Sequence, residues 1–179
     1  GFNDDPRERA PLCESILLAA GRVDEAYRRF GVLAARASTY IATFRALAKR
    51  YPSKPPQQLL ADLAASSPGD EGKWFAAARD VGLHDQALEL ARRSPGAPKT
   101  LIHAATEELA ERPVFALEVG YLALHWIVEG YGYDITGYDV LAAYNATMKA
   151  AEALGRRDES FARVRALVAS ETFGERFVT

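Results

Sequence analysis

The chain has 179 residues, the length of one ordinary domain or of a short array of repeats that folds as a unit. Its composition favours helices, because 33 Ala and 19 Leu stand against 10 Val and 5 Ile. Hydrophobic residues at 49% and charged residues at 26% are ordinary for globular proteins, which excludes wholesale disorder. The net charge of -2 gives no overall field that would attract a polyanion such as nucleic acid.

Neither a membrane segment nor a disulfide framework is indicated by the sequence. The longest apolar run, residues 115–128, is interrupted by two polar residues and is shorter than the roughly 20 residues of a spanning helix. The single cysteine, Cys13, stands between Leu12 and Ile16 on what we predict to be the buried apolar face of the first helix, where a thiol is usually inert. We therefore expect a cytoplasmic protein without a membrane partner.

Glycine and proline divide the chain into amphipathic stretches, each of which predicts a helix. In the stretch 38–50, apolar residues including Phe44 and Leu47 recur at steps of three and four up to Tyr51, and Pro52 then ends the helix. No stretch alternates apolar and polar residues for long enough to predict a strand. In chain order, the predicted helices are 7–20, 23–35, 38–50, 56–65, 70–80, 83–93, 98–111, 113–129, 137–154 and 157–169, with a last turn near 171–177.

The predicted helix 113–129 differs from the others because apolar side chains cover most of its circumference. Its polar residues Glu118, His125 and Glu129 share one narrow stripe, at spacings of seven and four. Such a helix needs neighbours on nearly every side. We predict that it is the most buried element of the fold.

A short motif recurs where predicted helices meet, and it predicts antiparallel helical hairpins. It consists of a helix end, a Gly, two further residues, an Asp, an acidic or amide residue, a small residue and a large apolar residue. We expect the Gly to close the first helix with a positive φ, the Asp to cap the second helix, and the small residue to let the two helices approach closely. The copies have Gly21 with Ala26, Gly82 with Ala87 and Gly155 with Ser160, and a degenerate copy has Pro113 with Ala116.

These copies recur at an irregular period near thirty residues, which is typical of stacked helical hairpins. Residues 17–30 resemble the core of a tetratricopeptide-type repeat, and residues 83–93 and 151–164 resemble weaker versions of it. The resemblance implies an all-α fold of about ten helices in antiparallel hairpins, stacked as a right-handed tetratricopeptide-like solenoid. We expect one such domain, residues 1–179, cut from the C-terminal part of a longer protein.

The sequence contains no pattern typical of catalysis or of a cofactor site. His84, His103 and His125 lack the spacing of metal ligands, and we predict that His84 is a solvated turn residue. The glycines of Gly130–Gly132 do not form a phosphate-binding loop, because no strand precedes them. We therefore expect a protein that is not an enzyme and that holds no metal or cofactor.

Two groups of residues are candidate ligand contacts. The first is basic and lies in the stretches 38–50 and 70–80, which the resemblance places on the groove-lining helices, where cations would clamp acidic groups of a peptide. The second is the tyrosines of the connection 130–138, which either recognise a ligand or cap the helix 113–129. For the basic group, the alternative is a solvated helix face. The candidates are Arg45, Lys49, Lys73, Arg79, Tyr131, Tyr133 and Tyr138.

The resemblance implies a non-catalytic scaffold for protein–protein interaction, whose partner is a protein, a peptide or another domain of the same chain. The alternative is a structural or regulatory domain of a larger multidomain protein or enzyme, with no ligand of its own. Nucleic acid is not an expected partner, because the arginines between Arg22 and Arg36 are not interleaved with aromatic residues.

Overall fold

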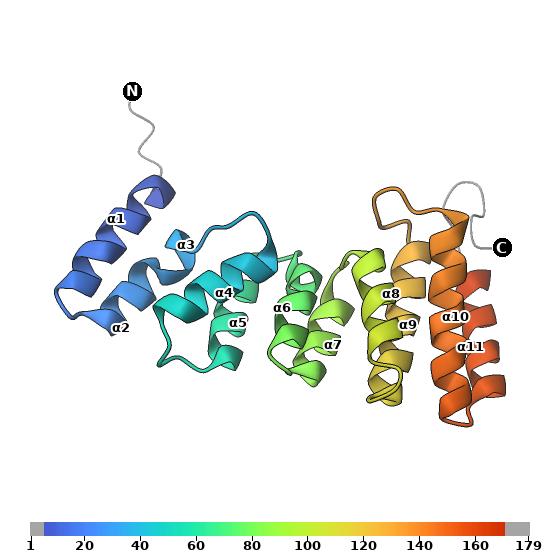
Figure 1. The fold of residues 1–179 in the computed structure, drawn as a ribbon. Helices are drawn as coiled ribbons and strands as arrows, with labels where there is room; N and C mark the ends of the chain where they lie inside the picture. The colour runs from blue at the N-terminus through green and yellow to red at the C-terminus, as the bar shows by residue number, and fades with distance from the viewer. Residues whose placement is uncertain (1–5, 171–179) are drawn as a thin grey trace. The chain divides into compact units, whose positions relative to one another are not determined.

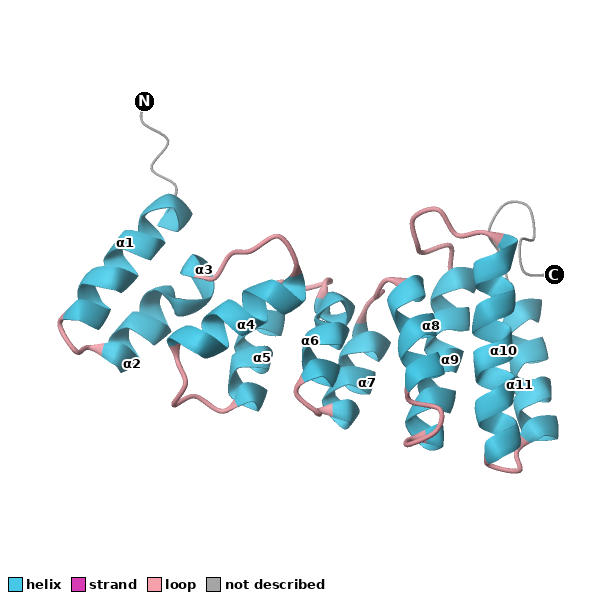
Figure 2. Ribbon diagram, viewed as in Figure 1, coloured by secondary structure: helices cyan, strands magenta, loops and turns pink. Residues whose placement is uncertain are grey.

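The computed structural model describes residues 6–170 and shows helices joined by short connections (Figures 1 and 2). Within those residues there are ten continuous helical runs and no strand, as the composition predicts. None of these runs is long and apolar enough to cross a bilayer. The turn predicted near 171–177 lies outside the described residues.

The helices of the first half of the chain begin and end close to their predicted limits. One run is continuous but not uniform, because a π-helical turn, η1, interrupts it, and such turns are uncommon and occur frequently at functional sites. The elements are α1 (Pro6–Ala19), then the run α2 (Val23–Ala26), η1 (Tyr27–Gly31) and α3 (Val32–Ala34), then α4 (Tyr40–Arg50) and α5 (Pro56–Ala65).

In the second half, two predicted helices differ from the observed ones. The stretch predicted as 70–80 opens with a 3-10 turn, and the helix predicted to end at residue 111 ends at Glu107. The elements are η2 (Glu71–Trp74), α6 (Phe75–Asp80), α7 (His84–Arg93), α8 (Pro98–Glu107), α9 (Pro113–Val128), α10 (Gly137–Ala153) and α11 (Arg157–Ala169).

The described residues divide into two compact units. Unit 1 contains residues 6–68 and 76–83, and unit 2 contains residues 69–75 and 84–170. Phe75, the first residue of α6, therefore belongs to unit 2, whereas the rest of α6 belongs to unit 1.

In unit 1, α1 packs against the α2–η1–α3 run, and α4 packs against α5. The predicted apolar face of α4 is confirmed, because Phe44, Leu47 and the following Tyr51 are all buried. Pro56 is the first residue of α5. Proline is favoured there because a backbone N–H at the first position of a helix has no partner within the helix.

The predicted buried face of α1 is wrong. Leu12 is 65% exposed and Ile16 is 59% exposed, whereas Glu14 and Leu17 are buried. Cys13 is half-buried. The helix is oriented so that Glu14 points into unit 1, while Leu12 and Ile16 point toward solvent. The cost of burying the Glu14 carboxylate is offset because it accepts hydrogen bonds there, one of them from Tyr51.

In unit 2, α9 is confirmed as the most buried helix, since twelve of its sixteen residues are buried. It contacts α7, α8, α10 and α11, and Figure 1 shows α8, α9, α10 and α11 side by side with their axes nearly aligned. Gly120 marks a close approach to α10, because a Cβ atom added there would lie 2.4 Å from Thr147 Oγ1 and 3.1 Å from Thr147 Cα.

The predicted closing role of the motif glycines is confirmed. Gly21, Gly82 and Gly155 have φ values of 74°, 76° and 66°. Each donates its N–H to the carbonyl three residues back, while the next residue donates to the carbonyl five residues back, for example Arg22 to Leu17 at 2.9 Å. This is the Schellman pattern of helix ends. Gly130, which is outside the motif, closes α9 in the same way.

Two other predictions from the motif are only partly confirmed. Asp24, Asp85 and Asp158 lie in the first turns of their helices, but in α2 and α11 the N-cap positions are Arg22 and Arg156, without side-chain capping. Asp24 lies two residues after the N-cap, so its carboxylate is close to the positive end of the helix dipole. Its ion-pair partner is Lys54. The motif also predicts that its large apolar residue fills the groove between the two helices. Tyr27 and Leu88 are buried, as this predicts, whereas Phe161 is 46% exposed.

Replacing Gly21 with Val tests the helix end. Nothing lies within 4 Å of a Cβ atom added there, so the positive φ alone opposes the side chain, and we expect a loss of about 1–2 kcal/mol in the free energy of unfolding. The matched control is Gly137→Val, where space is equally open and φ is not in the left-handed region. Urea unfolding measures both, and equal losses would contradict the assignment.

Replacing Gly120 with Ala tests the close approach of α9 and α10. Because the new methyl group would overlap Thr147, we expect a loss of about 1–3 kcal/mol in the free energy of unfolding. The double variant with Thr147→Ala should lose less than the sum of the two single variants, since the smaller side chain gives room. Additive losses in a double-mutant cycle would show that the two residues do not oppose each other.

Candidate functional site

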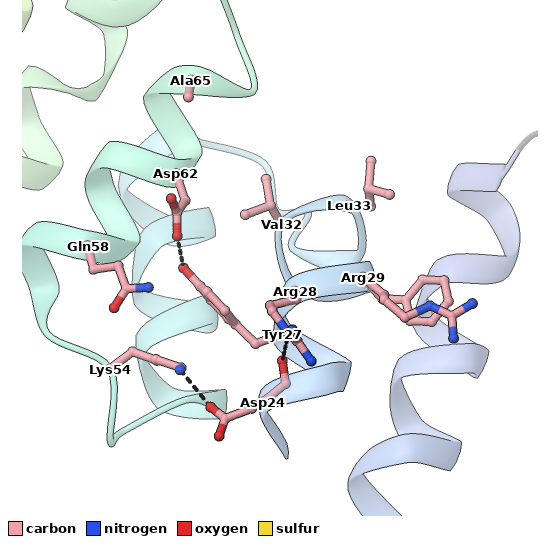
Figure 3. A pocket seen from close by; sticks show the side chains of 11 residues that line it. Asp24, Tyr27, Arg28, Arg29, Val32, Leu33, Lys54, Gln58, Asp62 and Ala65 are labelled. Atoms are coloured by element: carbon pink, nitrogen blue, oxygen red, sulfur yellow. Dashed lines mark hydrogen bonds and ion pairs between the residues drawn. The ribbon is translucent and has the colours of Figure 1, made fainter. Parts of the chain in front are cut away.

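The described part of unit 1 contains a hollow of about 820 Å³, which we call the unit 1 hollow (Figure 3). One wall is α5, which contributes Gln58, Asp62 and Ala65 at helical spacings of four and three. The other wall is the α2–η1–α3 run. The lining residues are Asp24, Tyr27, Arg28, Arg29, Phe30, Val32, Leu33, Lys54, Gln58, Asp62 and Ala65.

A hydrogen bond joins the two walls at the base of this hollow. The Tyr27 hydroxyl donates to Asp62 Oδ2 at 2.5 Å, and Figure 3 shows the phenol reaching across to α5. The Tyr27 ring also packs edge-on against Tyr51, with ring centroids 5.0 Å apart. Gly31 makes this packing possible, because a Cβ atom there would lie 2.9 Å from Tyr27 Cδ2 and 3.3 Å from Tyr51 Cε2.

A second buried network continues behind Tyr51. Its hydroxyl donates to Glu14 Oε1 at 2.6 Å, and Arg50 donates to the other carboxylate oxygen of Glu14. Glu14 is only 2% exposed, so both of its oxygens find donors inside the unit. These bonds fix α1 to α4 and hold the Tyr51 ring where Tyr27 rests on it.

The hydroxyl groups of Tyr27 and Tyr51 are both held in the neutral form. Burial raises the pKa of Tyr27 above its ordinary value, and the carboxylate of Asp62 raises it further. Burial likewise raises the pKa of Tyr51, with a further contribution from Glu14. Neutral hydroxyls can donate to these carboxylates, so the networks persist across neutral and moderately alkaline pH.

Two basic residues at the mouth of the unit 1 hollow, Lys54 and Arg28, differ in how they are paired. Lys54 Nζ lies 2.7 Å from Asp24 Oδ1 and 5.2 Å from the centre of the Tyr27 ring, and its pairing lowers the pKa of Asp24. Arg28 differs, because its Nε reaches only the backbone carbonyl of Asp24, at 3.4 Å. Among the described residues, Arg28 forms no ion pair. Figure 3 shows Lys54 and Arg28 reaching toward Asp24 from opposite sides.

The four basic residues singled out from the sequence do not line this hollow. Arg45 donates twice to the Asp80 carboxylate, at 3.0 Å from Nε and 2.7 Å from Nη2. Lys73 pairs with Asp70 at 2.9 Å. Arg79 is half-buried and Lys49 is exposed. Arg45 and Lys73 therefore already hold carboxylates of their own unit, and this neutralises part of the predicted clamp.

The three predicted tyrosines lie on and beside the connection between α9 and α10. Tyr131 packs edge-on against Trp126 at 5.4 Å, as the capping alternative expected, but it remains 48% exposed. Tyr133 is 89% exposed and Tyr138 is 80% exposed. The connection has a defined backbone, since Thr136 and Asp139 form a reciprocal capping box at the start of α10.

The histidines lie in three different environments. His84 was predicted to be solvated, but its ring packs edge-on against Phe115 at 4.8 Å and its Nε2 lies 3.8 Å from Glu108 Oε2. His103 is exposed and pairs with Glu107 at 3.1 Å, whereas His125 packs against Trp126. No group of three or more metal-ligating side chains occurs within residues 6–170.

Sequence reasoning did not identify the unit 1 hollow, although one signal for it was present. Gly31 interrupts a stretch that otherwise predicts a helix, and an isolated glycine in such a position often has a packing or functional reason. Here it marks the π-helical turn and the Tyr27–Tyr51 contact. The pairing of Tyr27 with Asp62 joins residues 35 positions apart, which no local pattern reveals.

Comparisons with known proteins identify no relative. No protein-family model matches the sequence, and comparison with curated proteins and with solved structures found no significant similarity.

Replacing Tyr27 with Phe tests the neutral phenol. In the parent protein the unfolded chain loses the phenolic proton at an ordinary pKa near 10, before the folded chain does, so stability falls as pH rises above about 10. Tyr27→Phe should flatten this fall and cost about 1 kcal/mol at neutral pH, where the Asp62 bond is lost. Urea unfolding between about pH 8 and 11 measures both effects.

The control for this variant is Tyr133→Phe, which alters an exposed phenol in unit 2. It should leave the slope of stability against pH unchanged. Parallel curves for the parent protein and Tyr27→Phe would show that the Tyr27 pKa is not raised.

Proposed function

We propose that the protein is a non-catalytic helical scaffold of the tetratricopeptide-like type, which binds a segment of another protein, or of another domain of its own chain, at the unit 1 hollow. Its favoured ligand is a peptide that carries an acidic side chain beside an apolar one. The observation that carries the proposal is the Arg28 guanidinium, which borders an open hollow and forms no ion pair among the described residues, although its charge acts on the Asp24 carboxylate from beyond ion-pair distance.

The charge at the mouth of the hollow supports an acidic ligand. An arginine side chain presents five N–H donors in a fixed plane, and a carboxylate accepts two of them at once. Arg28 uses one donor in a long bond of 3.4 Å, which leaves the rest for a ligand. Lys54 is only 20% exposed and pairs with Asp24 over the Tyr27 ring, so it offsets the carboxylate that lies beside Arg28.

The apolar part of the lining supports a peptide rather than a simple ion. Val32 and Leu33 lie beside the charged groups, and Leu33 is 41% exposed. Covering such a side chain releases its hydration water and stabilises a complex by about 25 cal/mol for each Å² buried. A ligand that places an aliphatic residue next to its carboxylate would use both surfaces.

The scaffold class rests on the sequence resemblance and on the helix ends. The resembling segment 17–30 contains Gly21, whose Schellman geometry is the kind of tight turn that a helical hairpin requires. Ala26, the small residue of the same motif, is buried between α2 and its neighbours. Stacking of such pairs into a solenoid would form a groove along one side, and this arrangement is part of the proposal.

A structural or regulatory domain without its own ligand is the second candidate. It is favoured by the internal pairing of Arg45 with Asp80 and of Arg50 with Glu14, which shows charged groups used to hold the unit together. The two candidates differ in what they require of Arg28: a ligand contact in the first, and only a solvated side chain in the second.

Selection of peptides and charge reversal test the proposal. The protein is used to select from a displayed random peptide library, and the recovered peptides are synthesised and titrated against the parent protein, Arg28→Glu and Arg36→Glu. We expect enrichment of acidic residues beside aliphatic ones, and a loss of affinity of about tenfold or more for Arg28→Glu. Arg36→Glu makes the same substitution at an exposed residue of unit 1 outside the hollow.

Equal weakening by the two variants would show that only the overall charge matters. Peptides without acidic residues, or peptides whose binding is unchanged by Arg28→Glu, would contradict the assignment. Failure to recover any binding peptide would favour the domain without a ligand.

A further inference from the structure

Unit 2 contains a second hollow, of about 440 Å³, on the polar stripe of α9. We call it the unit 2 hollow. Its charged lining residues are Arg92 from α7, Glu118 from α9 and Arg163 from α11, and its apolar ones include Leu122 and Leu167. It lies entirely within one unit and shares no residue with the unit 1 hollow.

Arg163 is held in a fixed position in this hollow. Its guanidinium carbon lies 3.8 Å from the centre of the Tyr121 ring, close enough for a strong cation–π contact. Tyr121 is itself fixed, because its hydroxyl donates to Ser160 Oγ at 2.7 Å and both residues are buried. The stacked guanidinium therefore loses little freedom when it binds an acceptor.

The donors of Arg163 are not used within the described residues. Arg92 Nη2 donates to Glu118 Oε2 at 3.0 Å. Arg163 Nη1 is 3.6 Å from the other oxygen of Glu118, which is an ion pair but too long for a hydrogen bond. Glu118 therefore fixes Arg92 and only attracts Arg163, whose planar set of N–H groups has no acceptor in residues 6–170.

The charges of the hollow do not cancel. Among the charged lining residues, two guanidinium groups face one carboxylate, which leaves one positive charge. Outside the lining, Glu159 also acts on Arg163, but Arg156 donates to both of its oxygens, so the balance stays positive. One added carboxylate would neutralise the hollow, whereas a phosphate dianion would leave it negative beside Glu118. Leu122 and Leu167 lie in the same lining and would contact an apolar group attached to that carboxylate.

From this geometry we propose that the unit 2 hollow is a second ligand site, which binds a peptide carboxylate through the Arg163 guanidinium, with an aliphatic neighbour of that carboxylate against Leu122 and Leu167. The carboxylate belongs to an acidic side chain or to a chain terminus, since both present the same two oxygens. The site does not depend on the unit 1 hollow, so one can fail without the other.

The test uses three short peptides and one phosphate probe with the protein of residues 1–179. Acetyl-Leu-Asp-Leu-amide carries a side-chain carboxylate, acetyl-Leu-Asn-Leu with a free terminus carries a terminal one, and acetyl-Leu-Asn-Leu-amide carries neither. The probe for a dianion is phenyl phosphate. Binding is followed by NMR through the Nε–Hε signal of Arg163 and the indole N–H signal of Trp126.

We expect saturable shifts of the Arg163 signal with at least one carboxylate peptide, with a Kd of about 1 mM as befits a single contact. The peptide without a carboxylate should bind at least about tenfold more weakly. The two carboxylate peptides distinguish a side-chain ligand from a terminal one. Tighter binding of phenyl phosphate than of both would overturn the carboxylate assignment.

Two glutamine variants locate the site. Arg163→Gln should weaken binding of the preferred peptide about tenfold or more, with the shift of the Trp126 signal as readout. Arg165→Gln removes the same charge from the same helix at a residue that does not line the hollow. Both residues are exposed, so folding is expected to survive, and thermal unfolding verifies this. Equal weakening by both, or no saturable shift with either carboxylate peptide, would overturn the proposal.

Discussion

The absence of a side chain at a few contact points sets how closely the helices of each unit approach. In unit 2, α9 and α10 approach so closely at Gly120 that Thr147 leaves no room for a Cβ atom. In unit 1, the missing side chain of Gly31 leaves the space that the rings of Tyr27 and Tyr51 occupy. Burial of the surrounding apolar residues stabilises each unit, but these contacts decide which surfaces meet, because larger residues would hold the helices apart.

The same constraint explains where the hollows occur. In unit 1, Tyr27 of the π-helical turn reaches Asp62 of α5, and Asp24, Arg28 and Lys54 line the hollow beside this contact. In unit 2, α9 is apolar nearly all round except for the stripe that contains Glu118, and the hollow opens along that stripe. In both units the charged side chains that line a hollow lie where the helices are no longer closely packed.

Local patterns in the sequence predict the fold at the level of single helices and their ends. Periodicity predicts nearly every helix, and glycine at a helix end predicts the positive φ at Gly21, Gly82 and Gly155. The sites are less predictable, since they depend on pairs distant in sequence, such as Tyr121 with Ser160. The orientation of α1 was missed for a related reason: burial of Glu14 is favourable only because Tyr51, far along the chain, donates to it.

The π-helical turn over Tyr27–Gly31 determines how this helix would respond to the loss of one residue. Such a turn holds one residue more than an α-helical turn, so deleting a residue within it would leave a regular α-helix rather than a broken one. The wider turn takes up the extra residue, so the helix that follows the deletion would keep nearly the same orientation about its axis. What would change is the turn itself: Tyr27 and Gly31 would shift relative to each other, and the contacts of Tyr27 with Asp62 and Tyr51 at the unit 1 hollow would be disturbed although the helix survives.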